Sequence, residues 1–554
     1  MLSIFSFISL TIIAVGLLFF GVFISQSGKL TQFINFLIVI YFSYYLWLDS
    51  SGMLYNNEEA SSFLNSFEFI QEDTLFFRFF AFYTNIIIIV FFFGICDRFF
   101  RSKNAVFEFP FLIIFLHFGG LFALYINNFI DIFLALELAT LTSYVLITFE
   151  RQNRFSTYAG IQYFILGSLP SARLLIAFGL FYLQGGSVVF QDLDLLFSNV
   201  VIPSVWNSNT FFIADTFNDA VEIISPERNL NTTELISTFW HQNRNPINFF
   251  SNEFINNTID TINPLNSIRI VSLFFLLFNF FFKLTAAPFH VWAPSVYGKG
   301  PIASVAFLSI YSKTRILFLR YKLINSFLHI FSFIILISLI FIGLLSIVTG
   351  IIGAFSEKTI KRFFVYSSRG HVGFILIGFG VITIEGSIAS FHYLFVYILS
   401  SFIIWFRLLS IGRNKQKLVQ LAELKTRNPM LALIFAFLIF SISGIPPFAG
   451  FFIKLDILTS VIDSSHFFVT YFRFLCTVIS FFYYLRLIKI MFFDQKNESV
   501  MTNIALYSIF TNEAPYNVYR LWTIALLIIF LGCYMLFMHK PIFIIESQIL
   551  STLF

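Results

Sequence analysis

Ionisable side chains occur inside long apolar stretches of this 554-residue chain. Lys283 lies within VSLFFLLFNFFFKLTAAPFHVWAP, and Glu137 lies within FLALELATLTSYVLITF. A charge at bilayer depth costs roughly 2.5–3.5 kcal/mol on insertion scales, so such groups normally face a protein interior or a water-filled path. Pro288 removes a backbone donor and should break the helix that carries Lys283. A buried lysine beside a broken helix is what an ion pathway needs, which predicts a membrane protein that moves protons.

The same combination recurs later in the chain. Lys454 follows the sequence Gly444-Ile445-Pro446-Pro447, which should also break a helix. Lys313, within FLSIYSKTRILFLR, is either a buried mid-helix cation or a side chain that reaches the membrane interface, because further arginines follow it. A lysine with a nearby carboxylate can change its protonation state when that partner moves.

Glu137 has two interpretations. It is either a protonated carboxyl group hydrogen-bonded in the core or a carboxylate with a cationic partner, for which Lys283 is the natural candidate. His371, within KRFFVYSSRGHVGFILIGFG, is either a proton relay or a structural residue near a helix end. His290 and His392 are weaker relay candidates. Hydroxyl groups that either line a hydrated path or only bond backbone are those of Thr142, Ser143, Tyr144, Ser367 and Ser368.

The composition excludes an ordinary soluble protein. The chain is 58% hydrophobic and 11% charged, whereas soluble proteins carry about 25% charged residues. Its apolar runs are continuous over about 20 residues, which indicates membrane helices and argues against a β-barrel with alternating strands. The 84 phenylalanines are best explained by codon bias in an AT-rich genome.

No cofactor or nucleic-acid partner is expected from the motifs. Cys96, Cys476 and Cys533 are scattered without CxxC spacing, which predicts no iron–sulfur or zinc site. No haem or nucleotide motif occurs. The net charge of +5 comes from basic residues in short loops and does not indicate nucleic-acid binding.

The hydrophobic runs predict about 14 membrane-spanning helices. The predicted spans are 2–25, 32–48, 77–97, 107–126, 129–149, 157–184, 268–290, 300–321, 326–354, 362–384, 387–411, 430–455, 464–491 and 519–539. Two polar segments interrupt them, the acidic segment 49–75 and the long, Asn-rich segment 186–267. The first run lacks a basic flank and a cleavage site, so it is expected to be a span rather than a removed signal.

Basic residues gather in or beside the loops after odd-numbered spans, so these loops should face the cytoplasm or its organellar equivalent. Both termini and segment 186–267 should then face the other side. The residues concerned are Arg98, Arg101, Lys103, Arg151, Arg154, Lys358, Lys361, Arg362, Arg413, Lys415, Lys417, Lys425, Arg427, Lys489 and Lys496.

Spans four to thirteen divide into two halves of five, and the fourth helix of each half should be broken. Because five is an odd number, the second half should be inverted relative to the first, as in many transporters. The expected units are 1–106 with the first three spans, 107–185 and 268–321 as the first repeat, 186–267 as a soluble insertion, 322–492 as the second repeat, and 493–554 with the last span.

At the residues that carry this chemistry, the chain resembles the antiporter-like membrane subunits of respiratory complex I. The resemblance rests on FFKLTAAPFHVWAPSVYGKGPIASVAFLSIYSK, EKTIKRFFVYSSRGHVGF, SISGIPPFAGFFIKLDIL, ALELATLTSYVLITF and YAGIQYFILGSLPSARLLIAFGLFYL, between about 107 and 492. Three kinds of antiporter-like subunit exist in this family. Lys454 and the absence of a long lateral helix favour the kind numbered 2. Phenylalanine content and size favour an organelle-encoded protein of the mitochondrial inner membrane.

The resemblance implies roles for individual residues. Glu137, Lys283, Lys313, His371 and Lys454 would form a midplane chain that passes protons, coupled to quinone reduction elsewhere. The chain would be a subunit of the proton-translocating NADH:ubiquinone reductase with no redox chemistry of its own. It would bind no cofactor, because FMN, the iron–sulfur clusters and ubiquinone belong to other subunits. Its partners would be lipids and other membrane-arm subunits, including a neighbouring antiporter-like subunit.

Three residues depart from the family pattern. Arg173 replaces a small residue and would pair with a carboxylate such as Glu137, line a different water path, or reach the interface. Ser312 replaces a proline, and Gln162 replaces a lysine. Segment 186–267 has no counterpart in the family core and is expected to dock extra subunits. The alternatives to a complex I subunit are a subunit of a multisubunit cation/proton antiporter and a structural spacer that has lost pumping.

Overall fold

The computed structural model describes residues 108–190, 192–194, 264–328, 331–381, 383–411, 417–422, 425, 429–446 and 448–493. These residues are almost entirely helical, and six of their helices are long and apolar enough to cross a membrane. The all-α membrane fold is therefore confirmed for this part of the chain. Outside it lie the predicted spans 2–25, 32–48, 77–97 and 519–539, segment 49–75 and most of segment 186–267.

The helices follow one another in two series with the same order: three unbroken helices, a broken helix and a fifth helix. The first series consists of α5 (Glu108–Tyr125), α6 (Phe129–Thr148), α7 (Arg154–Gly185), the broken pair α13 (Pro264–Lys283) and α14 (Trp292–Lys299), and α15 (Ile302–Leu323). A π-helical turn, η3 (Ile324–Leu328), follows α15.

The second series repeats this order. It consists of α16 (Ser332–Ser356), α17 (Ile360–Gly380), α18 (Ile384–Ile411), the broken pair α20 (Pro429–Ser443) and α21 (Ala449–Asp463), and α22 (Phe467–Phe492). A 3₁₀ turn, η5 (Leu418–Leu421), lies between α18 and α20. All ten spans predicted between 107 and 491 thus coincide with helices or broken helices.

The first break begins earlier than Pro288. Helix α13 ends at Lys283, and Thr285 has a φ of 61°. A proline in a helix clashes with the carbonyl four residues before it, here that of Leu284, so α13 cannot continue into this segment. The predicted helix 268–290 is therefore too long, and Lys283 is the last residue of α13 rather than a mid-helix residue.

The second break is built around Gly444, whose φ of 88° lies in the left-handed region that glycine adopts without strain. The N–H of Ile445 bonds to the carbonyl oxygen of Phe440 at 3.3 Å, which is the Schellman ending of a helix. The predicted span 430–455 is consequently two helices, and Lys454 belongs to the second of them.

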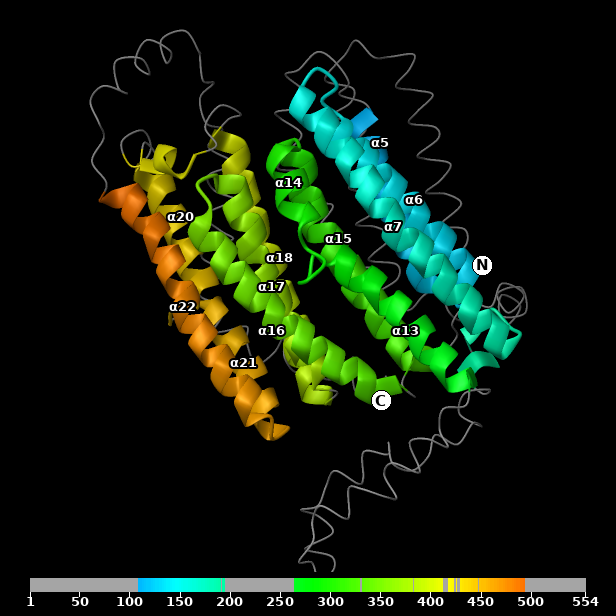
Figure 1. Cartoon of the computed structure of the whole chain (residues 1–554). Helices are drawn as coiled ribbons and strands as arrows, with labels where there is room; N and C mark the ends of the chain where they lie inside the picture. Colours follow the sequence, from blue (N-terminus) through cyan, green and yellow to red (C-terminus); the bar gives the residue numbers. More distant parts are fainter. Residues whose placement is uncertain are drawn as a thin grey trace, which may run out of the picture.

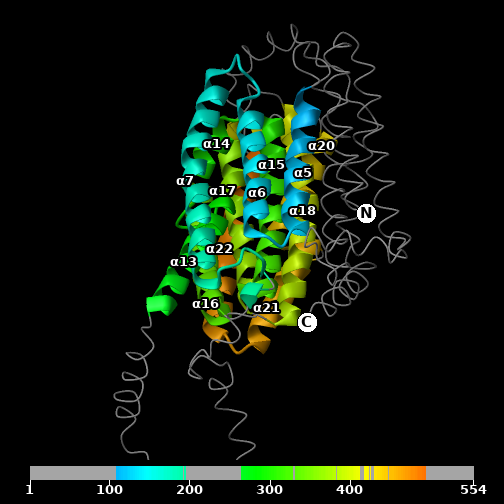
Figure 2. The same cartoon turned by 90° about the vertical axis from the view of Figure 1, so that its right-hand side faces the viewer.

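Helices α15 and α18 form the centre of the bundle. In the most apolar stretch of each helix, 89% of the residues of α15 and 94% of those of α18 are buried. The corresponding fraction is 39% for α7, α16 and α22. Helix α15 contacts α5 and α6 on one side and α18 on the other, and α14 packs between α7 and α17. Figure 1 shows α5–α7 at one edge of the bundle and α20–α22 at the other, and Figure 2, turned by 90°, shows α5–α7 in front.

The peripheral helices expose apolar side chains, as expected of surfaces that face lipid. On α7 these include Phe155, Ile161, Phe164, Ile165 and Leu169; on α22 they include Phe467, Phe468, Tyr471, Phe474 and Phe482.

Basic side chains bond the carbonyl oxygens at the ends of other helices. Lys322 on α15 donates to Leu124 near the end of α5 at 2.6 Å, and Lys361 on α17 donates to Gly300 after α14 at 2.9 Å. Lys425 donates to Phe492 of α22 at 3.0 Å, and Arg486 donates to Phe355 of α16 at 2.7 Å. Helix C-termini carry partial negative charge, so each of these contacts links two elements favourably.

Candidate functional site

Glu137 lies in the interior of α6 and is partly buried. Its Oε2 atom accepts a bond from the Thr140 hydroxyl at 3.4 Å, and its buried Oε1 atom has no hydrogen-bond partner among the described residues. Polar and aromatic groups continue along the same side, because the Ser143 hydroxyl donates to Tyr163 at 3.4 Å and Tyr144 packs edge-on against Tyr163. The carboxylate therefore lies in a partly polar environment on α6.

Lys283, at the end of α13, lies within electrostatic range of Glu137 and Arg315. Its buried Nζ atom makes no hydrogen bond in the described part of the chain, so lysine and carboxylate are neighbours without bonding each other. Arg315 on α15 is 3% exposed and interacts electrostatically with Tyr311, Tyr163 and Glu137. One carboxylate thus faces two cations from different helices.

Lys313 is 1% exposed, and its Nζ atom donates to the Ser368 hydroxyl on α17 at 2.8 Å. Arg315 and Arg320, which favoured interface contact for this region, are 3% and 2% exposed. The interpretation that Lys313 extends to the interface is therefore wrong, because α15 is the central helix of the bundle. The bond to Ser368 connects the last helix of the first series to the second helix of the next.

His371 lies in the middle of α17 rather than near its end. Its Nδ1 atom is 2.7 Å from the Tyr393 hydroxyl on α18, and its Nε2 atom is 3.0 Å from the Tyr484 hydroxyl on α22. The Tyr484 hydroxyl is also 2.5 Å from the Ser367 hydroxyl. The imidazole therefore joins three helices in one hydrogen-bonded string, and it lies within electrostatic range of both Lys313 and Lys454.

Lys454, near the start of α21, reaches back across the second break. Its Nζ atom donates to the carbonyl oxygens of Ile442 at 3.2 Å and Ser443 at 2.7 Å. These carbonyls end α20, where the helix dipole favours a cation. Arg473 on α22 lies within electrostatic range of Lys454.

A cavity borders His371 between α17, α18 and α20. It is lined by Phe364, Ser367, Ser368, His371, Tyr397, Ser400, Ser401, Ile404, Trp405 and Ile442. Four serine hydroxyls and a tyrosine make one part of this lining polar. Of the predicted hydroxyl groups, Ser368 accepts a bond from Lys313, and Ser367 contacts Tyr484, which in turn contacts His371.

Sequence reasoning missed two buried arginines, Arg369 and Arg473, which are both fully buried. Their guanidinium groups lie over the rings of Tyr366 at 4.7 Å and Phe374 at 4.6 Å. Their position inside predicted apolar spans is the signal that could have identified them. With Lys283, Lys313 and Lys454, they form a row of buried cations that extends from the first series into the second.

The remaining candidates lie closer to the edges of this row. Arg173 on α7 stacks over the Phe278 ring at 4.0 Å, and the described residues show no ion pair between it and Glu137. His290 lies in the first break, within electrostatic range of Arg369. Ser312 donates to the Leu308 carbonyl at 2.5 Å, and Thr142 donates to the Ala139 carbonyl at 2.9 Å.

Comparison with known proteins gives a consistent family assignment. The family described as "NADH:quinone oxidoreductase/Mrp antiporter, TM" matches residues 126–218 and 236–480. The NADH-quinone oxidoreductase subunit N of Rhodospirillum rubrum is 29% identical over 401 residues, covering 72% of this chain and 70% of that protein. The NADH-ubiquinone oxidoreductase chain 2 of Arabidopsis thaliana is 30% identical over 401 residues, covering 72% and 68%.

Solved structures share the fold. A chain of respiratory complex I from Thermus thermophilus with bound aureothin has a TM-score of 0.62 at 19% identity, covering 99% of both chains. A chain of the Mrp complex from a Dietzia species has a TM-score of 0.70 at 14% identity, covering 99% of this chain and 96% of that one. Together with the matched residues, these relatives show that the chain belongs to the NADH:quinone oxidoreductase/Mrp antiporter family of membrane subunits.

Proposed function

We propose that this chain is a proton-translocating membrane subunit of respiratory complex I. The observation that carries the proposal is the row of buried ionisable groups that continues through both series of helices, from Glu137 and Lys283 through Lys313 and His371 to Lys454. The proteins called subunit N and chain 2, which are 29–30% identical to it, support assignment to complex I rather than to an Mrp-type antiporter. The likeness to the Mrp complex, at 14% identity, supports the fold alone.

In the proposed mechanism Glu137 and Lys283 form the first switch. Their charges attract while both are ionised, and neither is held to the other by a hydrogen bond. When the attraction is released, Lys283 can give up a proton that moves towards Lys313. Arg315 stays protonated under all ordinary conditions, so it holds the carboxylate without relaying protons.

Lys313, His371 and Lys454 would carry the proton through the second series. The Ser368 hydroxyl bonds Lys313, and the Tyr393 and Tyr484 hydroxyls bond both nitrogens of His371. Hydroxyl groups both donate and accept hydrogen bonds, so they can pass protons between such groups. The energy would come from quinone reduction in other subunits, which carry the flavin and the iron–sulfur clusters.

The finer aspects of the assignment follow from the sequence. The two series would be inverted repeats, since five spans separate corresponding helices. Chain 2 proteins of plants support a mitochondrial inner-membrane location, and the basic loops support an orientation with the termini and segment 186–267 in the intermembrane space. Protease added to mitoplasts should then cut within 186–267 unless another subunit covers it, and labelling of that segment only from the matrix side would contradict the orientation.

The decisive experiment removes one member of the first switch. Removing one partner of a buried charge pair costs about 3–5 kcal/mol, because the other is left uncompensated. Glu137→Gln or Lys283→Ala in the assembled complex should lower proton pumping and coupled quinone reduction together. Asp131→Asn, in the first turn of the same helix, is the matched control and should leave both unchanged. Full pumping by an assembled Lys283→Ala complex would exclude this mechanism.

A further inference from the structure

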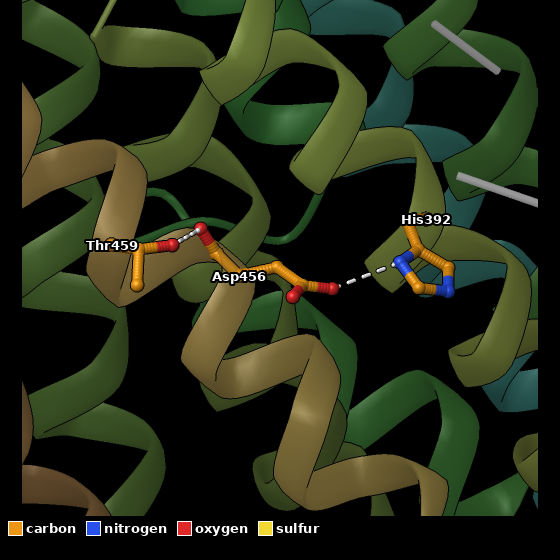
Figure 3. Close-up of polar contacts among 3 residues, drawn as sticks. All are labelled: His392, Asp456 and Thr459. Carbon is orange, nitrogen blue, oxygen red and sulfur yellow. Dashed lines mark hydrogen bonds and ion pairs between the residues drawn. The ribbon is translucent and has the colours of Figure 1, made fainter. Parts of the chain in front are cut away.

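His392 and Asp456 form a partly buried contact outside the row of groups described above. The Nδ1 atom of His392 on α18 lies 3.0 Å from the Oδ2 atom of Asp456 on α21 (Figure 3). The histidine side chain is fully buried, and the carboxylate is 17% exposed. Because a carboxylate accepts hydrogen bonds and does not donate them, Nδ1 is the donor. The contact therefore joins the second half of the broken helix to the central helix α18.

Asp456 has an unusual location among the acidic residues that the structure describes. In the second series Glu357 caps α16, Glu385 lies in the first turn of α18, and Asp463 ends α21. Asp456 alone in that series lies in a helix interior, as Glu137 does in the first. It follows Lys454 by two residues on the same half-helix, so a contact that fixes Asp456 also fixes the helix that carries Lys454.

The position of α21 decides where Lys454 can reach. No continuous helix joins α21 to α20, because the chain leaves the helix at Gly444 and resumes it at Ala449. Contacts between side chains must therefore hold α21 in place. The space beside Lys454 is small, since a Cβ atom at Gly444 would lie 3.0 Å from the lysine Nζ atom. A small shift of α21 would change the bonds of Lys454 to the end of α20.

Helix α18 holds two functional elements through adjacent residues. His392 bonds Asp456 on α21, and the next residue, Tyr393, bonds His371 on α17. In the membrane-spanning part of α18, 94% of the residues are buried. Packing on all sides therefore fixes this helix, and it supports both contacts.

We propose that His392 and Asp456 are a positioning pair. Their hydrogen bond holds α21 against α18 and so places Lys454 where it bonds the end of α20. The same helix α18 holds His371 through Tyr393. The inference rests on the proposed function of Lys454. It assigns no proton-carrying role to either residue.

Substitutions in the assembled complex separate the hydrogen bond from the charge. Asp456→Leu removes both, whereas Asp456→Asn keeps an oxygen that accepts from His392. Asp456→Leu should slow coupled proton pumping by up to about a hundred-fold, the cost of misplacing a reacting group by about 1 Å. Asp456→Asn should keep most of the pumping. His392→Asn keeps a hydrogen-bond donor near the position of Nδ1 and should also keep most of the pumping. This variant tests the hydrogen bond even if the Asp456→Leu complex fails to assemble.

Thr459→Val is the matched control. Its hydroxyl bonds the backbone carbonyl of Asp456 at 2.8 Å on the exposed side, so the carboxylate stays in place (Figure 3). A structure of the Asp456→Leu complex gives a second readout, in which the Lys454 Nζ atom should lie beyond bonding distance of the Ser443 carbonyl.

The outcomes distinguish this inference from the proposed function. Normal pumping by Asp456→Leu together with lost pumping by Lys454→Ala would overturn the positioning pair and keep the function. Normal pumping by both variants would overturn the function. Equal loss in Asp456→Leu and Asp456→Asn, with Lys454 still bonded to Ser443, would show that the carboxylate itself handles protons and would also overturn the positioning role.

Discussion

The two broken helices place a lysine in opposite situations. Lys283 ends the first half of its pair, and its Nζ atom has no hydrogen bond among the described residues. Lys454 lies in the second half of its pair, five residues after its start, and bonds two carbonyl oxygens across the break. In the first break the indole N–H of Trp292 bonds the carbonyl of Phe282 at 3.3 Å instead. In the first series a tryptophan therefore donates to a carbonyl near the helix end, as a lysine does in the second series.

This difference separates two uses of a break. In the first series the lysine can respond to the charge on Glu137, because no carbonyl oxygen in the described part of the chain holds it. In the second series the helix end itself stabilises the lysine charge, as the partial negative charge of a helix C-terminus does. Release of a proton from Lys454 would require these bonds to loosen, so we expect the two lysines to differ in their effect on stability more than in their effect on pumping.

The largest expected effect distinguishes the lysines directly. Lys454→Met leaves two carbonyls without their donor, at about 1–3 kcal/mol each, whereas Lys283→Met removes no hydrogen bond. Both variants should lose pumping, but Lys454→Met should also lower the midpoint of heat inactivation of the purified complex far more. Equal midpoints for the two variants would show that the carbonyl contacts do not stabilise the second break.

A smaller effect is expected from Gly444→Ala. An alanine at a φ of 88° costs about 1–2 kcal/mol, and its Cβ atom would lie 3.0 Å from Lys454. The variant should lower the heat-inactivation midpoint and reduce pumping in part. Gly179→Ala is the control, since no atom lies within 4 Å of its Cβ position and alanine favours a helix; if both variants behaved alike, the break would not depend on Gly444.

The smallest effect should follow Trp292→Phe in the first break. The variant loses the indole hydrogen bond to the Phe282 carbonyl, worth about 1 kcal/mol. It keeps an aromatic ring at this position, where the Trp292 ring centroid lies 5.0 Å from that of Tyr163 and 5.2 Å from that of Phe282. The stability of the complex should fall slightly. Its proton pumping, measured as proton uptake in liposomes, should be unchanged. A complete loss of pumping would mean that the indole positions Lys283 and that the two breaks are more alike than their bonds indicate.

Helix positions were predictable from the sequence, because apolar runs of membrane length and helix-breaking glycines and prolines are local signals. This holds for the broken helices around Pro288 and Gly444. The ends of these helices were less predictable: α13 stops at Lys283 because the proline excludes the preceding turn, and α21 extends beyond the expected span to Asp463.

The partners of the buried groups were not predictable, because they depend on how each helix is rotated within the bundle. His371 bonds Tyr393 and Tyr484, which are 22 and 113 residues away. The position of Arg369 and Arg473 inside apolar spans marks them in the sequence, but only packing shows that both side chains are fully buried and stacked on aromatic rings. His392 was a weak candidate until the structure placed Asp456 beside it.

The lysines that bond the ends of other helices have a consequence for how the chain is made. Lys361 and Lys425 bond carbonyl oxygens in the folded protein, and they also belong to the basic loops that predict orientation. The same charges would first keep these loops from crossing the membrane during synthesis and later fasten neighbouring helices together. Replacing either residue by glutamine should therefore produce two defects separated in time, an early one in the insertion of the new chain and a later one in the lifetime of the finished bundle.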